Sequence, residues 1–471
     1  MNLKLVKHTL IYGLSPYAPR LLGILILPII TKDLTQLDYG VYGIILSYVA
    51  GIEVLKDLGL NMIFYNSHTQ MPKQFRWMWR SIYGFLMLWN LVYALLAAGL
   101  IYLIVPPEAK EHVFLIMLLN VLPIVLFGPT SLIGRIYYQM EERPMQIAWR
   151  TIVFGTLTIF LNLYTISYLK LGYIGWFWST CIVTVGLNAS FWYPINRKYK
   201  ITPIFNFKWR LMKNNLKVSL PTVPHYYSSF LIQTSDKVIL NLMKVSTESV
   251  GNYTFAGSFA SYFNQLGNAI GQASRATLNL NNKAQNYKAN RNLIFKVQLF
   301  FFAATFLSCI WLKEIFSLLI NNDGLAATYP MAIILIMAAN YRPMYLGATN
   351  YIFYIERTKK LIYITLAASV ISVLLNIIFI PYLGIIAAII TTYVSLMYMG
   401  YSGYYLKEFK DIKVKYYPLL WLFSTFLLTI SAYYIVEFDF FTKTIITLSV
   451  FSLSIIIFYF FYLRKSKYGK D

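Results

Sequence analysis

The sequence is poor in charge and in cysteine. Only 13% of its 471 residues are charged and 58% are hydrophobic, whereas soluble domains carry about 25% charged residues. That composition excludes an ordinary water-soluble protein. Cys181 and Cys309 both fall within apolar runs, and the four histidines are scattered. We therefore expect inert packing cysteines, with no disulfide, no metal site and no other cofactor.

Apolar runs of membrane-spanning length fill most of the chain. A helix needs about 20 mostly apolar residues to cross the hydrocarbon core of a bilayer. The sequence therefore predicts an all-α integral membrane protein with about fourteen transmembrane helices. They are expected near 9–31, 40–62, 81–105, 113–133, 147–169, 172–194, 217–241, 250–274, 293–320, 327–350, 361–382, 385–406, 416–436 and 442–463. The short connections leave no room for an extramembrane catalytic domain, so we do not expect an enzyme.

Basic residues are concentrated in alternate connections between these runs. The rich segments are 73–80, 135–150, 197–217, 275–296, 357–360, 407–415 and 464–470, whereas the connections between them hold few lysines, mostly beside acids. By the positive-inside rule, the basic side and both chain ends are predicted to be cytoplasmic. Membrane lipid headgroups are the expected partners of these loops. The net charge of +23 is therefore no sign of nucleic-acid binding.

Two blocks of sequence recur within the chain. Gly40 and Tyr42 correspond to Gly251 and Tyr253 at an offset of 211 residues. In the second block the offset is 214, and Pro129, Leu132, Tyr137, Glu142, Arg143, Asn162, Tyr168 and Leu169 match Pro343, Leu346, Tyr351, Glu356, Arg357, Asn376, Tyr382 and Leu383. Two blocks that agree within three residues indicate a duplicated unit.

The duplication predicts the domain organisation. Each copy contains six predicted spans, an even number, so both enter the membrane in the same orientation, as in transporters built from parallel repeats. We expect an N-terminal lobe at 1–196, a basic cytoplasmic linker at 197–216, a second lobe at 217–407 and two additional helices within 416–463.

Polar residues draw a stripe along the eighth predicted span. They are spaced by four, three, four, three, four and three residues, which keeps them on one face of a helix. The stripe comprises Thr254, Ser258, Ser261, Gln265, Asn268, Gln272 and Arg275. A similar series runs along the seventh span as Ser219, Thr222, Tyr226, Ser229, Gln233 and Asp236. Both series favour a hydrated cavity whose amides and hydroxyls suit a sugar, although hydrogen bonding within a packed bundle is the alternative.

Charged residues inside the predicted spans mark a second set of candidates. A charge at the bilayer centre costs about 2.5–3.5 kcal/mol, and Arg20 falls near the middle of its span, just after Pro16 and Pro19. Arg20 and Arg342 are predicted to meet an anionic group in transit. A structural pair between Arg20 and Glu53 is the alternative.

Three acidic residues within or near spans are candidates for coupling transport to Na⁺ or H⁺. They are Glu53, Asp57 and Asp236.

Three short motifs stand out in the sequence: Leu34–Gly43, Asp57-Leu58-Gly59-Leu60, and Ser235–Leu240 leading into Val250–Tyr253. They resemble motifs of the Wzx-like polysaccharide flippases, which belong to a superfamily (MOP) shared with MATE exporters and MurJ flippases. The family often carries an arginine soon after the second motif. The segment 61–66 has none, so no role is carried over to it.

This resemblance implies a function in the bacterial cytoplasmic membrane. The protein would flip an undecaprenyl-pyrophosphate-linked oligosaccharide to the outer leaflet by alternating access, for O-antigen, lipopolysaccharide or capsule assembly, beside polymerase or other assembly proteins. A MATE-like exporter of cations or drugs is one rival, and a flippase for peptidoglycan lipid precursors is another. A membrane-embedded polysaccharide polymerase belongs to a different class, and it would be expected to show a long extracytoplasmic loop or a cytoplasmic catalytic domain with clustered acids, neither of which the sequence contains.

Overall fold

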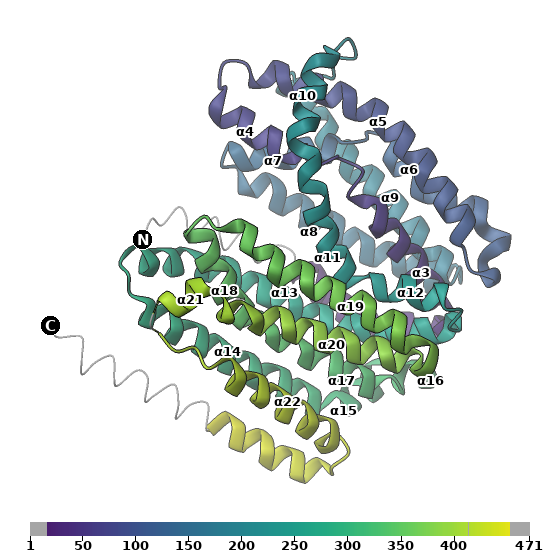
Figure 1. Ribbon diagram of the computed structural model, residues 1–471. Coiled ribbons are helices and arrows are strands. Elements are labelled where there is room, and N and C mark those ends of the chain that lie inside the picture. The colour runs from purple at the N-terminus through teal and green to yellow at the C-terminus, as the bar shows by residue number, and fades with distance from the viewer. Residues whose placement is uncertain (1–16, 413, 453–471) are drawn as a thin grey trace. The chain divides into compact units, whose positions relative to one another are not determined.

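The computed structural model describes residues 17–412 and 414–452, and these form helices and connections without any strand (Figure 1). The prediction of an all-α membrane protein is confirmed. Eight helical segments in this part are long and apolar enough to span a membrane: Phe75–Ile104, Pro144–Tyr168, Tyr173–Lys198, Tyr287–Ile310, Asp323–Tyr354, Tyr363–Leu383, Ile385–Tyr405 and Pro418–Ile435. A ninth is possible if the pair Pro107–Val125 and Thr130–Met140, bent by 42°, counts as one span. The full count of about fourteen stays a prediction.

The chain divides into two compact units. The first comprises Met1–Phe255, Leu319–Leu325 and Ser369–Ala388, and the second comprises Ala256–Leu318, Ala326–Ala368 and Ile389–Asp471. The lobe boundaries predicted from the repeat stay a prediction.

The first unit holds eleven helices of the described chain in full. They are α2 (Tyr17–Asp33), α3 (Gln36–Glu53), α4 (Asn61–Gln70), α5 (Phe75–Ile104), α6 (Val113–Val125), α7 (Thr130–Met140), α8 (Pro144–Asn162), α9 (Tyr173–Tyr193), α10 (Trp209–Ser219), α11 (Val223–Gln233) and α12 (Ser235–Leu242). One of its cores joins α4, α5, α7 and α9 through fully buried aromatic rings such as Trp79, Tyr83 and Phe191.

The second unit is built on long helices that lie side by side. It holds α14 (Tyr287–Ile310), most of α15 (Leu312–Leu319), α17 (Tyr329–Ala338), α18 (Arg342–Tyr354), α21 (Lys407–Asp411), α22 (Pro418–Ile435) and an apolar helix at Phe440–Ser452. Five helices of the described chain contain residues of both units: α15, through Leu319, and α13 (Thr247–Lys283), α16 (Asp323–Ala326), α19 (Leu361–Leu383) and α20 (Ile385–Tyr401).

The motif at Leu34–Gly43 starts α3 and ties it to α9. Thr35 and Asp38 form a capping box, in which the Thr35 hydroxyl accepts from the Asp38 amide and the Asp38 carboxylate accepts from the Thr35 amide. Such a box satisfies backbone donors that a helix start leaves free. The second Asp38 oxygen accepts from the Tyr173 amide at 2.8 Å, so one carboxylate holds the starts of two helices.

Two glycines of the repeat allow the first turns of α3 and α13 to touch. A Cβ on Gly40 would lie 2.0 Å from the Thr247 carbonyl oxygen, and one on Gly251 would lie 1.8 Å from that of Gln36. Gln36 corresponds to Thr247, and Gly40 to Gly251, at the offset of 211 residues found in the sequence. The contact is therefore symmetric, each copy placing a glycine against the other's backbone.

The second repeated block also recurs as backbone geometry. Glu142 has a φ of 51° and Glu356 one of 57°, both in the left-handed region. Lys170 and Gly384 likewise both have a φ of 56°. Non-glycine residues rarely adopt positive φ, so its recurrence at the offset of 214 residues supports the duplication independently of residue identity.

Candidate functional site

Arg342 is held by two amides of the neighbouring helix. It begins α18, within the span Asp323–Tyr354. Its Nε donates to the Asn264 Oδ1 at 3.2 Å and its Nη1 donates to the Asn268 Oδ1 at 2.5 Å. The guanidinium lies 5.4 Å from the centre of the Tyr341 ring. Neutral amides orient the cation without neutralising it, and no carboxylate of the described chain pairs with it.

Gly267 makes room for this arrangement. It lies between the two asparagines on α13, and a Cβ there would come within 2.8 Å of the Arg342 Cδ. Asn264 and Asn268 are four residues apart, so they lie on one face of the helix and reach the same guanidinium.

The predicted polar stripe lies on one continuous helix, because α13 runs unbroken over Thr247–Lys283. Ser258, Asn268 and Gln272 are exposed, and Ser261 and Gln265 are half-buried. On other faces of α13, Phe255, Ala256, Ala260 and Leu278 are buried. The stripe is therefore an accessible face for most of its length. Polar groups at membrane depth are costly in lipid, so such a face favours contact with water or with a polar ligand.

Arg275 lies at the far end of the same helix face. It is exposed and lines a small pocket of about 330 Å³ together with Asn279, Asn350 and Tyr354. This places two predicted cationic residues, Arg275 and Arg342, in one unit along one helix.

The predicted seventh span is not a single helix. The segment forms α10, a 3-10 turn at Leu220–Thr222, α11 and α12, because Pro221 and Pro224 lack the backbone N–H that a helix interior needs. A further break falls at Thr234, whose φ is −145°. Helix α10 starts at Trp209, inside the segment predicted to be a linker.

These breaks separate the second polar series. Its members are spread over four short elements instead of one helix face: Ser219 is buried, Gln233 is exposed, and the side chains of Tyr226 and Ser229 lie outside the described residues. The regular spacing in the sequence therefore does not describe a continuous polar surface here.

Glu53 and Asp57 are grouped around Lys56 where α3 ends. Lys56 interacts electrostatically with both carboxylates and with Arg135. Asp57 also accepts hydrogen bonds from the Gly59 amide at 3.2 Å and from the Asn61 side chain at 2.5 Å. Asp57 thus fixes the turn between α3 and α4, a structural role that does not need a bound ion.

Asp236 is buried at the start of α12 and accepts a hydrogen bond from the Tyr253 hydroxyl. The Lys237 amide also donates to it, at 2.7 Å. Both aspartates proposed for ion coupling therefore carry identified protein donors.

Arg20 lies in the first turn of α2 that the structure describes. Its guanidinium is 5.9 Å from the centre of the Tyr17 ring. Pro19, which comes directly before Arg20 in the same turn, is buried and packs close to Gly155 of α8. Pro16 lies outside the described residues.

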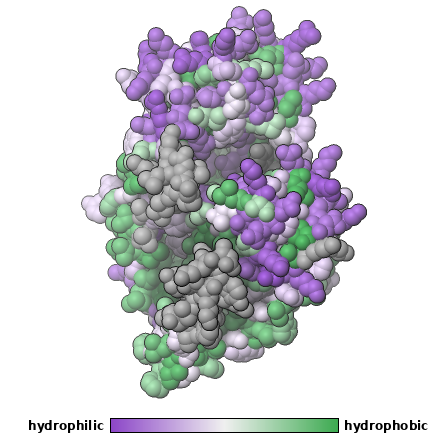
Figure 2. All heavy atoms as spheres, turned by 90° about the vertical axis from the view of Figure 1, so that its left-hand side faces the viewer, coloured by the Kyte–Doolittle hydropathy of each residue, from purple (hydrophilic) through white to green (hydrophobic). Residues whose placement is uncertain are grey.

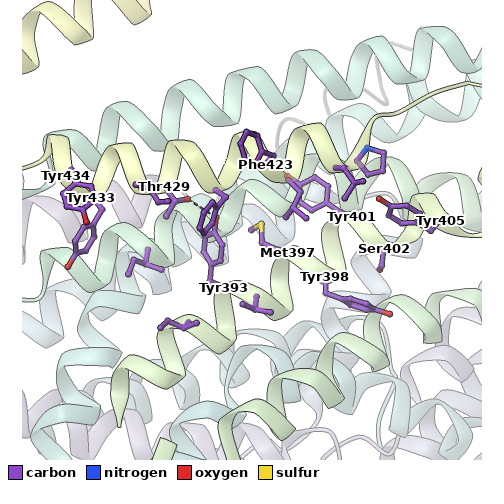
Figure 3. A pocket seen from close by; sticks show the side chains of 18 residues that line it. Tyr393, Met397, Tyr398, Tyr401, Ser402, Tyr405, Phe423, Thr429, Tyr433 and Tyr434 are labelled. Carbon is purple, nitrogen blue, oxygen red and sulfur yellow. Dashed lines mark hydrogen bonds between the residues drawn. The ribbon is translucent and has the colours of Figure 1, made fainter. Parts of the chain in front are cut away.

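A large apolar groove runs along the second unit between α17, α20 and α22 (Figure 3). It encloses about 1220 Å³. Tyrosines edge it, and two of them are tied across it, Tyr393 to Thr429 at 2.9 Å and Tyr401 to Thr425 at 2.8 Å. No local pattern in the sequence identified this groove, because its lining comes from α17, α20 and α22, which are separated along the chain.

Sequence spacing also missed Asn264, which is adjacent to Gln265 and so falls outside the predicted stripe. The pair Asn264 and Asn268 around Gly267 was the signal available for it. As for metals, no group of three or more His, Cys, Asp or Glu side chains in the described part of the chain could hold an ion.

Comparison with known proteins gives one family and one fold. A family described as "Polysaccharide biosynthesis protein" matches residues 5–275. No curated protein matches the chain.

The fold is shared with solved flippase and transporter structures. A lipid II flippase MurJ in an inward closed conformation aligns with a TM-score of 0.74 at 14% identity, over 96% of this chain and 99% of its own. A multidrug resistance MATE transporter of the MOP superfamily aligns in its inward-facing conformation with a TM-score of 0.59 at 15% identity, over 86% and 95%. Its outward-facing counterpart gives 0.57 at 16%, over 90% and 96%. The expected MOP-type fold is confirmed.

Proposed function

The chain belongs to the family of polysaccharide biosynthesis proteins, and on that premise we propose that it flips an undecaprenyl-pyrophosphate-linked oligosaccharide across the bacterial cytoplasmic membrane. It is a multi-pass membrane protein of the MOP fold. In this proposal it acts by alternating access, moves the saccharide to the outer leaflet for surface polysaccharide assembly, and makes or breaks no covalent bond. Its basic connections and both ends face the cytoplasm.

The observation that carries the proposal is the amide-held cation at Arg342. A guanidinium within a membrane span is expensive, and here it is positioned by groups that leave its charge available. Phosphate oxygens are the ligands that guanidinium groups bind with bidentate geometry. A pyrophosphate passing along α13 is therefore the partner that best fits this site.

The remaining surfaces of the site suit the other parts of such a substrate. The exposed hydroxyls and amides of α13 offer hydrogen bonds to sugar hydroxyls. The apolar groove beside α20 and α22 offers contact to a prenyl chain, which gains free energy wherever it leaves water. A lipid-linked saccharide combines the three chemistries.

The membrane potential can contribute to the driving force. Moving one elementary charge across 100 mV is worth about 2.3 kcal/mol. A pyrophosphate with about two negative charges would therefore gain about 4–5 kcal/mol per 100 mV when it leaves an inside-negative cell. Coupling to Na⁺ or H⁺ through Glu53, Asp57 or Asp236 is an additional proposal.

Charge distinguishes this proposal from export of cationic drugs. The fold does not, because both a lipid II flippase and multidrug transporters share it. A cation exporter needs a carboxylate in its cavity, whereas the charged groups at the polar stripe of α13 are two arginines, Arg275 at its end and Arg342, which α18 places against it. Electrostatic repulsion at these positions disfavours a cationic substrate.

The test is headgroup accessibility of labelled undecaprenyl-pyrophosphate oligosaccharide in proteoliposomes. Wild type is expected to expose the lipid on the opposite leaflet. Arg342→Gln, which loses the charge, should slow this by at least tenfold, and Arg342→Lys should keep part of the activity. Arg210→Gln removes a charge from an exposed residue of α10 and serves as the matched control. If the protein exports an organic cation and does not move the lipid, the flippase proposal is wrong and the exporter alternative is correct.

A further inference from the structure

Five asparagines form a directed chain of hydrogen bonds at one end of the second unit. Asn281 donates through Nδ2 to Asn290 at 2.9 Å, Asn290 to Asn282 at 2.6 Å, Asn282 to Asn350 at 3.2 Å, and Asn350 to Asn279 at 3.2 Å, each time to the next Oδ1. We call this chain the asparagine relay. It joins α13, α14 and α18, and its three central members, Asn282, Asn290 and Asn350, are buried.

One backbone carbonyl sets the direction of the asparagine relay. The Asn290 Nδ2 also donates to the Leu278 carbonyl oxygen at 3.1 Å. A carbonyl can only accept, so the Asn290 amide cannot be turned over, and each neighbouring amide must follow its orientation. Buried hydrogen bonds in such a series also polarise one another.

The asparagine relay ends in a donor that has no partner. The Asn279 Oδ1 accepts a hydrogen bond from Asn350, which leaves the two N–H groups of the Asn279 Nδ2 as the end of the relay. Asn279 is exposed, and these N–H groups make no further hydrogen bond with the described part of the protein. Arg275 is four residues earlier on the same face of α13, and it also has no ion-pair partner among the described residues.

Both groups line the small pocket of about 330 Å³ between α13 and α18. No acidic side chain lines it, and Phe353 and Tyr354 contribute aromatic rings to its lining. The pocket therefore combines a guanidinium with a fixed amide donor and offers no carboxylate to a cation. Figure 2 looks onto this end of α13, α14 and α18, which lies at the left of Figure 1, and shows hydrophilic residues gathered over part of it.

We propose that this pocket, between Arg275 and Asn279, binds a phosphate group of the lipid-linked substrate on the side predicted to be cytoplasmic. The proposal rests on the flippase function and adds a second, separate place for the anionic headgroup. Guanidinium and amide N–H groups are the donors that phosphate oxygens accept. The fixed direction of the asparagine relay makes the amide a donor before any ligand arrives, which favours anions over cations.

Asn279→Asp tests the donor without removing the relay. The new carboxylate keeps an oxygen that can accept from Asn350, but it replaces the free N–H groups by a negative oxygen. Asn286→Asp is the matched control, because Asn286 is exposed and only accepts, from the Ala289 amide at 3.1 Å. It brings the same charge change to the same end of the unit.

The experiment uses native mass spectrometry to measure how tightly undecaprenyl pyrophosphate binds to the purified full chain. Undecaprenol, which has the same prenyl chain without phosphate, reports on binding of the tail. Asn279→Asp and Arg275→Gln should each lower the affinity for the pyrophosphate lipid at least tenfold and leave the affinity for undecaprenol unchanged. Arg275→Lys should restore part of the affinity, and Asn286→Asp should bind like wild type. Thermal unfolding of each variant shows whether it is folded.

Other outcomes separate this site from the proposed function. If wild type binds the pyrophosphate lipid and folded Asn279→Asp binds it equally well, the pocket is not the phosphate site, while the flippase proposal stands. If wild type binds the pyrophosphate lipid no more tightly than undecaprenol, both proposals fail. Inorganic pyrophosphate is the last probe. If it binds the pocket and cannot be displaced by the lipid, the source is a soluble phosphate and the assignment to the substrate is overturned.

Discussion

The two copies of the repeat use the same helix position in opposite ways. At the offset of 211 residues, Glu53, Lys56 and Asp57 of the first copy correspond to Asn264, Gly267 and Asn268 of the second. In the first copy the helix ends at this point, and the charges are satisfied by one another and by the following turn. In the second copy α13 continues without a break.

This difference separates a structural use of charge from one that suits a ligand. Two acids and a lysine compensate each other locally, so the first copy presents little net charge. Two amides and a glycine instead hold an arginine that comes from α18, and that charge stays available. The duplicated framework has thus kept its geometry, while this helix position carries a compensated charge cluster in the first copy and holds an arginine between two amides in the second.

The largest effect is expected on stability, when the glycine contact between the two copies of the repeat is disrupted. Gly40→Ala or Gly251→Ala would place a methyl carbon about 2 Å from a backbone oxygen, which no rotamer change can relieve. We expect each to destabilise the protein by about 1–3 kcal/mol, measured as a lower thermal unfolding midpoint in detergent.

Gly99→Ala is the control for this pair, because nothing lies within 4 Å of a Cβ at that position of α5. Alanine in a helix interior should there be neutral or stabilising by about 0.5–1 kcal/mol. Equal destabilisation at Gly40 and Gly99 would mean that the symmetric contact is unimportant. Since Gly40 and Gly251 meet at one crossing, the double variant should cost less than the sum of the two.

Crowding the amide-held arginine is expected to have the next largest effect, on transport rather than on stability. Gly267→Ala pushes the flexible Arg342 side chain off its two asparagines, since the new Cβ would lie 2.8 Å from Cδ. Flipping in proteoliposomes should fall about threefold to tenfold. Gly257→Ala, on the same helix with its nearest neighbour 4.0 Å away, should transport like wild type. If both variants behave alike, the position of Arg342 does not matter.

A charge exchange between the copies should have a smaller effect. Asn268→Asp would give Arg342 the carboxylate partner that the first copy provides for Lys56. The ion pair should compete with the anionic substrate and weaken its binding, with transport reduced severalfold and partly recovered at high substrate concentration. Asp57→Asn makes the converse change and should preserve transport if Asp57 only fixes the turn. Loss of an Na⁺ or H⁺ dependence in Asp57→Asn would show that it couples ions instead.

A feature of the fold or of the candidate site could be predicted where it depends on residues that are close together in the sequence. The stripe from Thr254 to Arg275 could be predicted, because regular spacing within one helix is a local property of the sequence. The repeat was predictable for the same reason, and the glycines that revealed it proved to be contacts. By contrast, the break at Thr234 divided a series that looked equally regular in the sequence. Pro221 and Pro224 were visible in the sequence as signals for the first division of that series, whereas the spacing of its polar residues gave no sign of the break at Thr234.

The parts of the site that sequence reasoning missed are all non-local. Asn350 receives its hydrogen bond from Asn282, 68 residues earlier, and Arg342 donates to Asn264 across 78 residues. The apolar groove joins residues from 334 to 434. Each requires knowing which helices are neighbours, which periodicity cannot supply.

The smallest expected effect concerns a carboxylate outside both copies of the repeat. Glu437 lies between α22 and the apolar helix at Phe440–Ser452, and accepts from the Lys313 ammonium at 2.5 Å and from the Tyr329 hydroxyl. These hydrogen bonds, first from Lys313 and then from Tyr329, hold the pKa of Glu437 below its usual 4.5. Its contribution to stability is therefore complete above pH 4.5 and is lost as the pH falls through the lowered pKa.

Because both partners are about half exposed, solvent screening keeps this contribution small. Glu437→Gln should lower the unfolding midpoint slightly at pH 7, and its difference from wild type should shrink as the pH falls through the lowered pKa of Glu437. Asp57→Asn, measured in parallel, reports the acid dependence of the first copy. If Glu437→Gln lowers the midpoint equally at pH 7 and below that pKa, its hydrogen bonds do not depend on ionisation, and acid sensitivity must be sought within the repeat.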